Sequence, residues 1–113
     1  MTPDAFRKLA LSLPESSEGS HMGHPDFRVR GKIFATLGYP DATKAVVRIN
    51  SAQQDMLSCA EPGAFAPVPG AWGSRGATIV TLKKASKATT LDVLRMAWKN
   101  NAPKALLAAS RRP

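Results

Sequence analysis

Three strand-like segments follow one another in the chain, joined by turns that are too short to hold a helix. They cover residues 27–29, 32–37 and 44–49 and are rich in β-branched or aromatic side chains. Gly31 and the segment 38–41 supply the two turns. Strands joined by such short turns run antiparallel, because parallel strands need a long crossover. The chain is therefore constrained to contain an antiparallel meander.

Three helices are predicted around this meander. Residues 3–13 carry apolar side chains at the spacing of a core-facing helix, and Thr2 is suited to cap it. Ser51 is predicted to cap a short second helix, and Thr90 to cap a third that runs to about residue 100. We expect these helices to pack on the sheet.

The remaining segments complete the predicted order. Residues 77–82 form the clearest β-branched strand, and residues 63–76, rich in Gly and Pro, read as an irregular strand that ends in a loop. Residues 15–20 are predicted to be an exposed loop. The sequence thus predicts an α+β fold in the order α-β(3)-α-β(1-2)-α, with helices on an antiparallel sheet. Its 113 residues fit a single domain, 1–113.

The positive charge is concentrated in the last third of the chain. The formal net charge is +8. Residues 1–74 hold equal numbers of acids and bases, so the whole excess lies in residues 75–113. A concentrated positive field favours polyanions such as nucleic acid, acidic proteins or anionic lipids, although basic side chains also serve solubility alone.

The composition excludes several classes of protein. No apolar run is long enough to cross a membrane, and residues 1–18 lack the apolar core of a secretory signal. Cys59 is the only cysteine, so no intramolecular disulfide can form. We expect a cytoplasmic protein in which Cys59, beside Met56, is a buried apolar residue.

Cations gather at two predicted turns. One surrounds Gly31 and the other follows the strand 77–82. Basic turns suit phosphate backbones, whereas the alternative is a solvated sheet edge protected from aggregation. The candidate phosphate-binding side chains are Arg28, Arg30, Lys32, Arg75, Lys83, Lys84 and Lys87.

Trp72 lies in a glycine-rich loop beside Arg75. An indole next to a cation resembles a stacking or inserting tip on a nucleic-acid-binding loop. The alternative is that Trp72 folds back to cover the core, as large aromatic side chains usually do.

The sequence offers little for catalysis or metal binding. His21 and His24 are the only histidines, and on an extended segment their spacing places the side chains on opposite faces, which is poor geometry for one metal. No nucleophile or phosphate-loop motif occurs. We therefore expect no enzyme activity, no metal and no cofactor; an enzyme would have to use this histidine pair.

Several stretches resemble the MmcQ/YjbR-like family. They are the run 18–37, which includes Ser-His-Met-Gly-His-Pro, then Pro-Gly-Ala-Trp-Gly at 69–73, Ala-Trp at 97–98 and Ala-Pro-Lys at 102–104. The resemblance implies a compact α+β fold of the secretion-chaperone-like type. The positions that match the family's recurrent polar and aromatic residues are His21, His24, Phe27, Lys32, Trp72, Trp98 and Lys104.

The resemblance also carries a functional expectation. Members of the family are described as candidate DNA-binding proteins, because two of their loops are likened to a double wing. In this sequence the wings would be the hairpin around Arg30 and the loop from Trp72 to Arg75. The basic stretch formed by Lys83, Lys84 and Lys87 is a departure that is not expected in every member.

Two functions are therefore predicted. The first is a non-enzymatic protein that binds double-stranded DNA with low sequence specificity, mainly through phosphate contacts. The alternative is a protein- or small-ligand-binding domain whose groove lies near His21, His24, Phe27 and Trp72.

Overall fold

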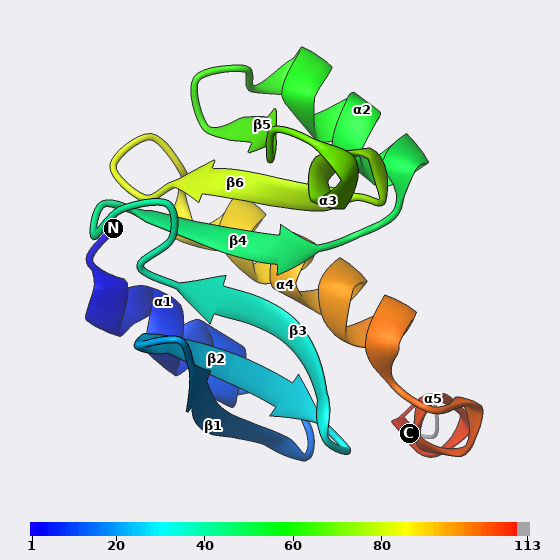
Figure 1. Cartoon of the computed structure of the whole chain (residues 1–113). Helices are drawn as coiled ribbons and strands as arrows, with labels where there is room; N and C mark the ends of the chain where they lie inside the picture. Colours follow the sequence, from blue (N-terminus) through cyan, green and yellow to red (C-terminus); the bar gives the residue numbers. More distant parts are fainter. Residues whose placement is uncertain (111–113) are drawn as a thin grey trace.

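The computed structural model describes residues 1–110, and in them five helices accompany a six-stranded sheet (Figure 1). The elements in chain order are α1 (Pro3–Leu11), β1 (Ser16–His21), β2 (His24–Val29), β3 (Lys32–Leu37), β4 (Lys44–Arg48), α2 (Ser51–Ala60), β5 (Phe65–Pro67), α3 (Ala71–Ser74), β6 (Ala77–Thr81), α4 (Lys87–Asn101) and α5 (Lys104–Ser110). The fold is α+β, as the sequence predicted.

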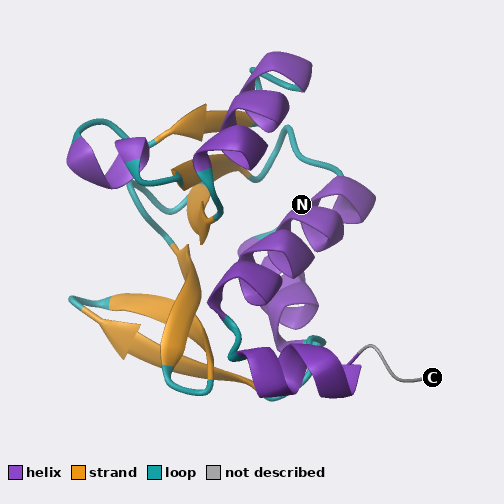
Figure 2. Ribbon diagram, turned by 90° about the vertical axis from the view of Figure 1, so that its right-hand side faces the viewer, coloured by secondary structure: helices purple, strands orange, loops and turns teal. Residues whose placement is uncertain are grey.

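The sheet has the strand order β1-β2-β3-β4-β6-β5, and every neighbouring pair is antiparallel. Helices α1 and α4 lie together on one face of the sheet (Figure 2). On the opposite face, the short helix α3 lies over β6. Among the described residues, much of that second face therefore has no covering helix.

The main core fills the space between the sheet and the helices α1 and α4. Phe6 of α1 packs against Phe27 of β2, with ring centroids 6.1 Å apart. Trp98 of α4 is buried, and its Nε1 donates a hydrogen bond to the carbonyl oxygen of Pro14 at 2.9 Å. Trp98 is thus a core residue, unlike Trp72.

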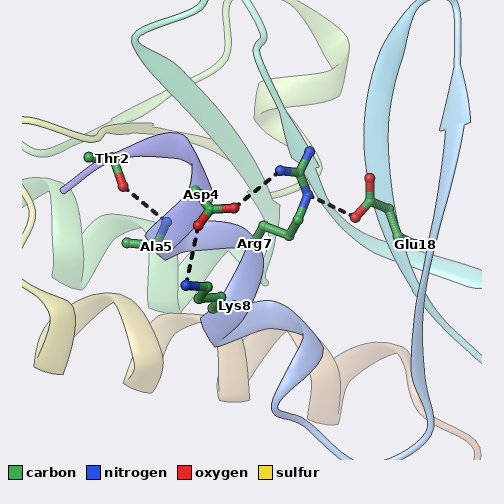
Figure 3. Close-up of polar contacts among 6 residues, drawn as sticks. All are labelled: Thr2, Asp4, Ala5, Arg7, Lys8 and Glu18. Atoms are coloured by element: carbon green, nitrogen blue, oxygen red, sulfur yellow. Dashed lines mark hydrogen bonds and ion pairs between the residues drawn. The ribbon is translucent and has the colours of Figure 1, made fainter.

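Helix α1 begins as predicted and is tied to the sheet (Figure 3). Thr2 Oγ1 accepts a hydrogen bond from the backbone N–H of Ala5 at 3.1 Å. Arg7 donates to Glu18 of β1 at 2.9 Å, and Asp4 forms ion pairs with Arg7 and Lys8. These contacts hold the N-terminal helix beside the first hairpin.

The predicted loop at 15–20 is wrong, because Ser16–His21 forms strand β1. The strand is polar and lies at the edge of the sheet, so no apolar alternation marks it in the sequence. It pairs with β2 through a two-residue turn at Met22 and Gly23, whose φ angles are both positive. The same kind of turn, Arg30 and Gly31, closes the β2–β3 hairpin that the sequence did predict.

Two predicted helix starts differ from the structure. The side chain of Asn50, not Ser51, caps α2 and forms a capping box with Gln53. Ser86 caps α4 one turn before the predicted start, and Thr90 is buried inside that helix. The structure has α3 at residues 71–74, where the sequence predicted a loop.

The prediction for Cys59 is also wrong. Both Cys59 and Met56 lie on exposed positions of α2, and Met56 is 53% exposed. The helix presents Gln54 and Leu57 to the interior instead.

In the described part of the chain, no helix is long and apolar enough to cross a bilayer.

Candidate functional site

A groove of about 480 Å³ opens at one end of the sheet. Its walls come from the start of β3, the end of β4, the α3 region and the last turn of α4. In Figure 1 this is the end toward which the β4 arrow points. The lining residues are Lys32, Arg48, Ile49, Asn50, Trp72, Arg75, Ala77, Asn100 and Asn101.

Strand pairing brings these sequence-distant residues together. Lys32 is the first residue of β3, and Arg48 is the last residue of β4. Arg48 is paired with Ala77 at the start of β6, which places Arg75 close to the same end of the sheet. Because adjacent strands here run antiparallel, the start of one strand lies beside the end of the next.

The groove is basic and has no acid in its lining. Among residues 1–110, no carboxylate lies within ion-pair distance of Lys32, Arg48 or Arg75. Lys32 and Arg75 are exposed, while Arg48 is half-buried, with its guanidinium 5.8 Å from the centroid of the Trp72 ring. The Nε atom of Arg48 is buried and has no hydrogen-bond partner in the part of the chain that the structure describes. These three cations can therefore take an anionic ligand without giving up an internal partner.

The two other predicted hairpin cations are already paired. Arg28 donates to both carboxylate oxygens of Asp26, at 2.7 and 3.0 Å, and these hydrogen bonds lower the pKa of Asp26. Arg30 donates to both oxygens of Glu15, at 2.5 and 3.1 Å, and lowers the pKa of Glu15. Of the three cations around Gly31, Lys32 is the one that lines the groove and has no carboxylate partner within residues 1–110.

A buried amide fixes the wall of the groove formed by α3 and β6. Gln54 of α2 donates from Nε2 to the carbonyl oxygens of Gly73 and Ala77, at 2.9 and 3.0 Å, and lies 3.2 Å from Thr78 Oγ1. Gly73 allows the close approach of α3, because a Cβ atom there would lie 1.5 Å from the carbonyl oxygen of Val68. These contacts hold the neighbouring Trp72 in place.

Trp72 does not project as a free tip. It is half-buried and packs with Tyr39 and Ile79 in a small apolar cluster around Val46. The rings of Tyr39 and Trp72 meet edge to face, with centroids 5.6 Å apart. The alternative prediction, that the indole folds back onto the body of the protein, describes it better. One part of its surface still lines the groove.

The two histidines lie on the same face, which corrects the prediction that they point apart. His21 and His24 are directly paired across the β1–β2 hairpin, because the chain turns back at Met22 and Gly23. Both line a second cavity of about 240 Å³, together with Met22, Thr36, Tyr39 and Trp72. No cluster of three or more metal-ligating side chains occurs among residues 1–110.

Phe27 does not belong to this cavity, contrary to prediction. Its side chain is fully buried and packs against Phe6 on the helix-covered face of the sheet. Side chains alternate between the two faces along a strand, so Phe27, three residues after the cavity-lining His24 on β2, points to the opposite face.

The second basic turn lies away from the groove. Lys83 and Lys84 follow the end of β6, whereas Arg75 precedes its beginning, and five strand residues span roughly 16 Å. Lys87 is the first residue of α4 and lines a shallow hollow beside Thr2 and other residues of the α1 start. The two predicted basic regions therefore do not form one continuous site.

Sequence reasoning missed Arg48 and the asparagines at 50, 100 and 101. Arg48 ends an apolar strand and has no acid near it in the sequence, which is the one signal that could have singled it out. The asparagines gave no signal: Asn50 reaches the groove because it follows the end of β4, and the packing of α4 against β4 brings the other two there. Of the family-like positions, Trp98 is a core residue and Lys104 begins α5.

Comparisons with known proteins agree with this fold. The YjbR family model matches residues 11–100. The crystal structure of the Deinococcus radiodurans protein DR2400, which has a DUF419 domain, is similar with a TM-score of 0.74 and 20% sequence identity. The match covers 99% of this chain and 89% of that chain. None of the curated proteins matches this chain significantly.

Proposed function

The chain belongs to the YjbR family, and from its basic groove we propose that it binds DNA through the phosphate groups without catalysing a reaction. The observation that carries the proposal is the set of three cations, Lys32, Arg48 and Arg75, that line one concave surface and lack a carboxylate partner among residues 1–110. Phosphate oxygens are the natural partners of such unpaired cations.

The neutral residues of the groove support the same ligand. Asn101 donates its amide hydrogens to the carbonyl oxygens of Arg48 and Ala97, and Asn100 donates to Gln53 Oε1. Among the described residues of the groove, Asn50 therefore offers the unengaged side-chain amide donor, and amides commonly bond to phosphate and sugar oxygens. The indole of Trp72 adds a flat apolar surface beside the cations. A single bound phosphate would use only part of this surface, whereas a phosphate backbone extends along it.

The groove predicts low sequence specificity. Its cations come from strand ends and a loop, and α4 buries Leu94 and Trp98 in the core, so that face of the helix is not free to enter a DNA groove. Phosphate contacts position a protein on DNA but do not read its sequence. Unrelated duplexes of equal length should therefore bind with similar affinity.

The test is a titration of a fluorescein-labelled random duplex across a series of salt concentrations, followed by anisotropy. Three phosphate contacts predict a slope of log K against log salt of about −3. Polyglutamate serves as the competitor, because it carries negative charge without phosphate groups. Binding that is steep in salt and resists polyglutamate supports the proposal. Absence of binding at low salt, or equal displacement by polyglutamate, contradicts it and favours an acidic protein partner.

A further inference from the structure

The second cavity lies directly beside the basic groove. Trp72 lines both of them, so its ring separates the two spaces. The cavity has a volume of about 240 Å³, which is smaller than the roughly 300–1,000 Å³ of pockets that bind drug-sized ligands. It suits one flat ring system.

A row of rings connects the cavity with the groove. The His24 ring meets Tyr39 at 90° with centroids 5.8 Å apart, and Tyr39 meets Trp72 at 5.6 Å. On the groove side, the guanidinium of Arg48 lies over the same indole at 5.8 Å. A flat ring held in the cavity would thus lie next to an anion held by Arg48.

The cavity also holds a polar group in a fixed orientation. His21 Nδ1 lies 2.7 Å from Asp26 Oδ2, and Asp26 is fully buried and held by Arg28. A carboxylate oxygen accepts a hydrogen bond, so this contact assigns the proton of the imidazole to Nδ1. Nε2 is then the ring nitrogen available to a ligand, and the His21 side chain is 35% exposed.

We propose that this cavity binds one unpaired nucleobase of the DNA strand whose phosphates occupy the groove, an inference that rests on the proposed function. A nucleotide joins a flat heterocycle to a phosphate through a sugar, which matches the adjacent aromatic cavity and basic groove. Bases in an intact duplex are stacked and paired, so they cannot enter such a cavity without leaving the helix. The protein should therefore bind single-stranded DNA more tightly than duplex DNA.

The test compares three labelled probes of equal length, about 12 nucleotides, at one low salt concentration. The probes are a deoxythymidine strand, a strand of abasic residues and a duplex. The abasic strand keeps every phosphate but has no base to stack. We expect the thymidine strand to bind about tenfold more tightly than the abasic strand.

A second readout follows the indole directly. Trp98 is buried in the core, whereas Trp72 lines the cavity, so a change of tryptophan emission on binding reports on Trp72. The thymidine strand should quench the emission, and the abasic strand should not.

The variant His24→Ala removes one wall of the cavity but leaves the groove intact. It should lose the preference for the thymidine strand while it binds the abasic strand as the wild type does. Met56→Ala, an exposed position on α2, is the control and should retain the preference. If His24→Ala retains the full preference, the base does not occupy this cavity and the inference is wrong.

The outcomes separate the two proposals. Equal, salt-dependent binding of thymidine and abasic strands overturns the nucleobase cavity but leaves phosphate binding intact. Failure of all three probes to bind at low salt overturns the proposed function itself, and this inference with it.

Discussion

The two basic regions of this molecule, the groove and the turn after β6, carry similar charge but differ in their surroundings. In the groove, Lys32, Arg48 and Arg75 converge on a concave surface with amides and an indole between them. In the turn, Lys83 and Lys84 are exposed near the tethered N-terminus, whose ammonium group donates to the carbonyl oxygen of Leu82. Of these two regions, only the groove combines positive charge with a concave surface.

The comparison shows that a count of cations says little about where an anion binds. Arg28 and Arg30 are close to the groove residue Lys32 in the sequence. Their guanidinium groups, however, already form hydrogen bonds with the carboxylates of Asp26 and Glu15. Arg48 is half-buried in the groove, so less water screens its charge than screens an exposed lysine, and Lys32 and Arg75 line the same concave surface without a carboxylate partner among residues 1–110. We therefore expect the groove to dominate binding.

The largest expected effect comes from a pair of double variants with equal loss of charge. In Lys32→Ala/Arg75→Ala, each charged contact removed should cost about 1.5 kcal/mol of DNA-binding free energy. For two contacts this is a loss of roughly 100-fold in DNA affinity. Lys83→Ala/Lys84→Ala should lose about threefold or less, through the long-range field alone. Anisotropy titration of one duplex measures both. Equal losses would mean that net charge, not the groove, governs binding.

The salt dependence of DNA affinity distinguishes the same two double variants further. The groove variant should flatten the slope of log K against log salt by about two. The turn variant should leave the slope nearly unchanged. A flattened slope in the turn variant would place Lys83 and Lys84 on the phosphates as well.

Gln54→Leu should disturb the groove without removing any of its charge. Three acceptors in the α3–β6 wall would lose their buried donor, at a cost of about 1–3 kcal/mol in unfolding free energy. The DNA affinity should fall as well, because α3 positions Trp72. Urea denaturation measures the stability, with Met56→Leu on the same helix as control. An unchanged urea midpoint would show that the hydrogen bonds of Gln54 do not stabilise the α3–β6 wall of the groove.

Asp26→Asn tests how much the ion pair between Asp26 and Arg28 stabilises the fold, and how this stabilisation depends on pH. The pKa of Asp26 is lowered by Arg28, so the carboxylate stabilises the fold fully above its unfolded value of 3.8 and loses this effect as the pH falls below 3.8. The variant should be less stable by about 1–3 kcal/mol near neutral pH. The difference from the wild type should shrink in acid below 3.8.

Urea denaturation near neutral pH and in acid measures this effect. Asp55→Asn, an exposed carboxylate on α2, is the control. A difference between Asp26→Asn and the wild type that does not change with pH would show that the carboxylate charge is not the source.

The smallest expected effect comes from Glu15→Gln. This change frees Arg30 of its exposed partner and removes one negative charge near the β2–β3 hairpin. We expect DNA affinity to rise by about twofold at low salt and the melting temperature to stay nearly unchanged. Weaker binding of this variant would contradict the view that Arg30 is held back from the ligand.

The sequence was informative wherever the signal was local. Apolar alternation and short turns predicted β3, β4, β6 and the hairpin at Gly31, and apolar spacing predicted α1 and α4. Strand β1 was missed because Ser16–His21 is an edge strand with polar side chains, so pairing with β2 rather than burial defines it. That error also produced the wrong orientation of His21 and His24, since the missing turn reverses the chain between them.

The candidate site could be predicted only in part. Lys32, Trp72 and Arg75 were among the expected residues, and the structure brings them to one groove. Phe27 was assigned to the wrong face, because the register of β2 was not known. Arg48 was overlooked, because its one signal in the sequence, the lack of a nearby acid, does not show that strand pairing brings it to the same end of the sheet as Lys32 and Arg75.

The sequence by itself determined the α+β class, the main helices and strands, and the total charge with its concentration in the last third of the chain. The tertiary structure decided which cations are paired, which are free and which share a surface. The physical reason is the separation along the chain over which each kind of interaction acts. Turn chemistry and apolar periodicity act between residues close in the chain, whereas the environment of Lys32, Arg48 and Arg75 depends on strand pairing between distant segments.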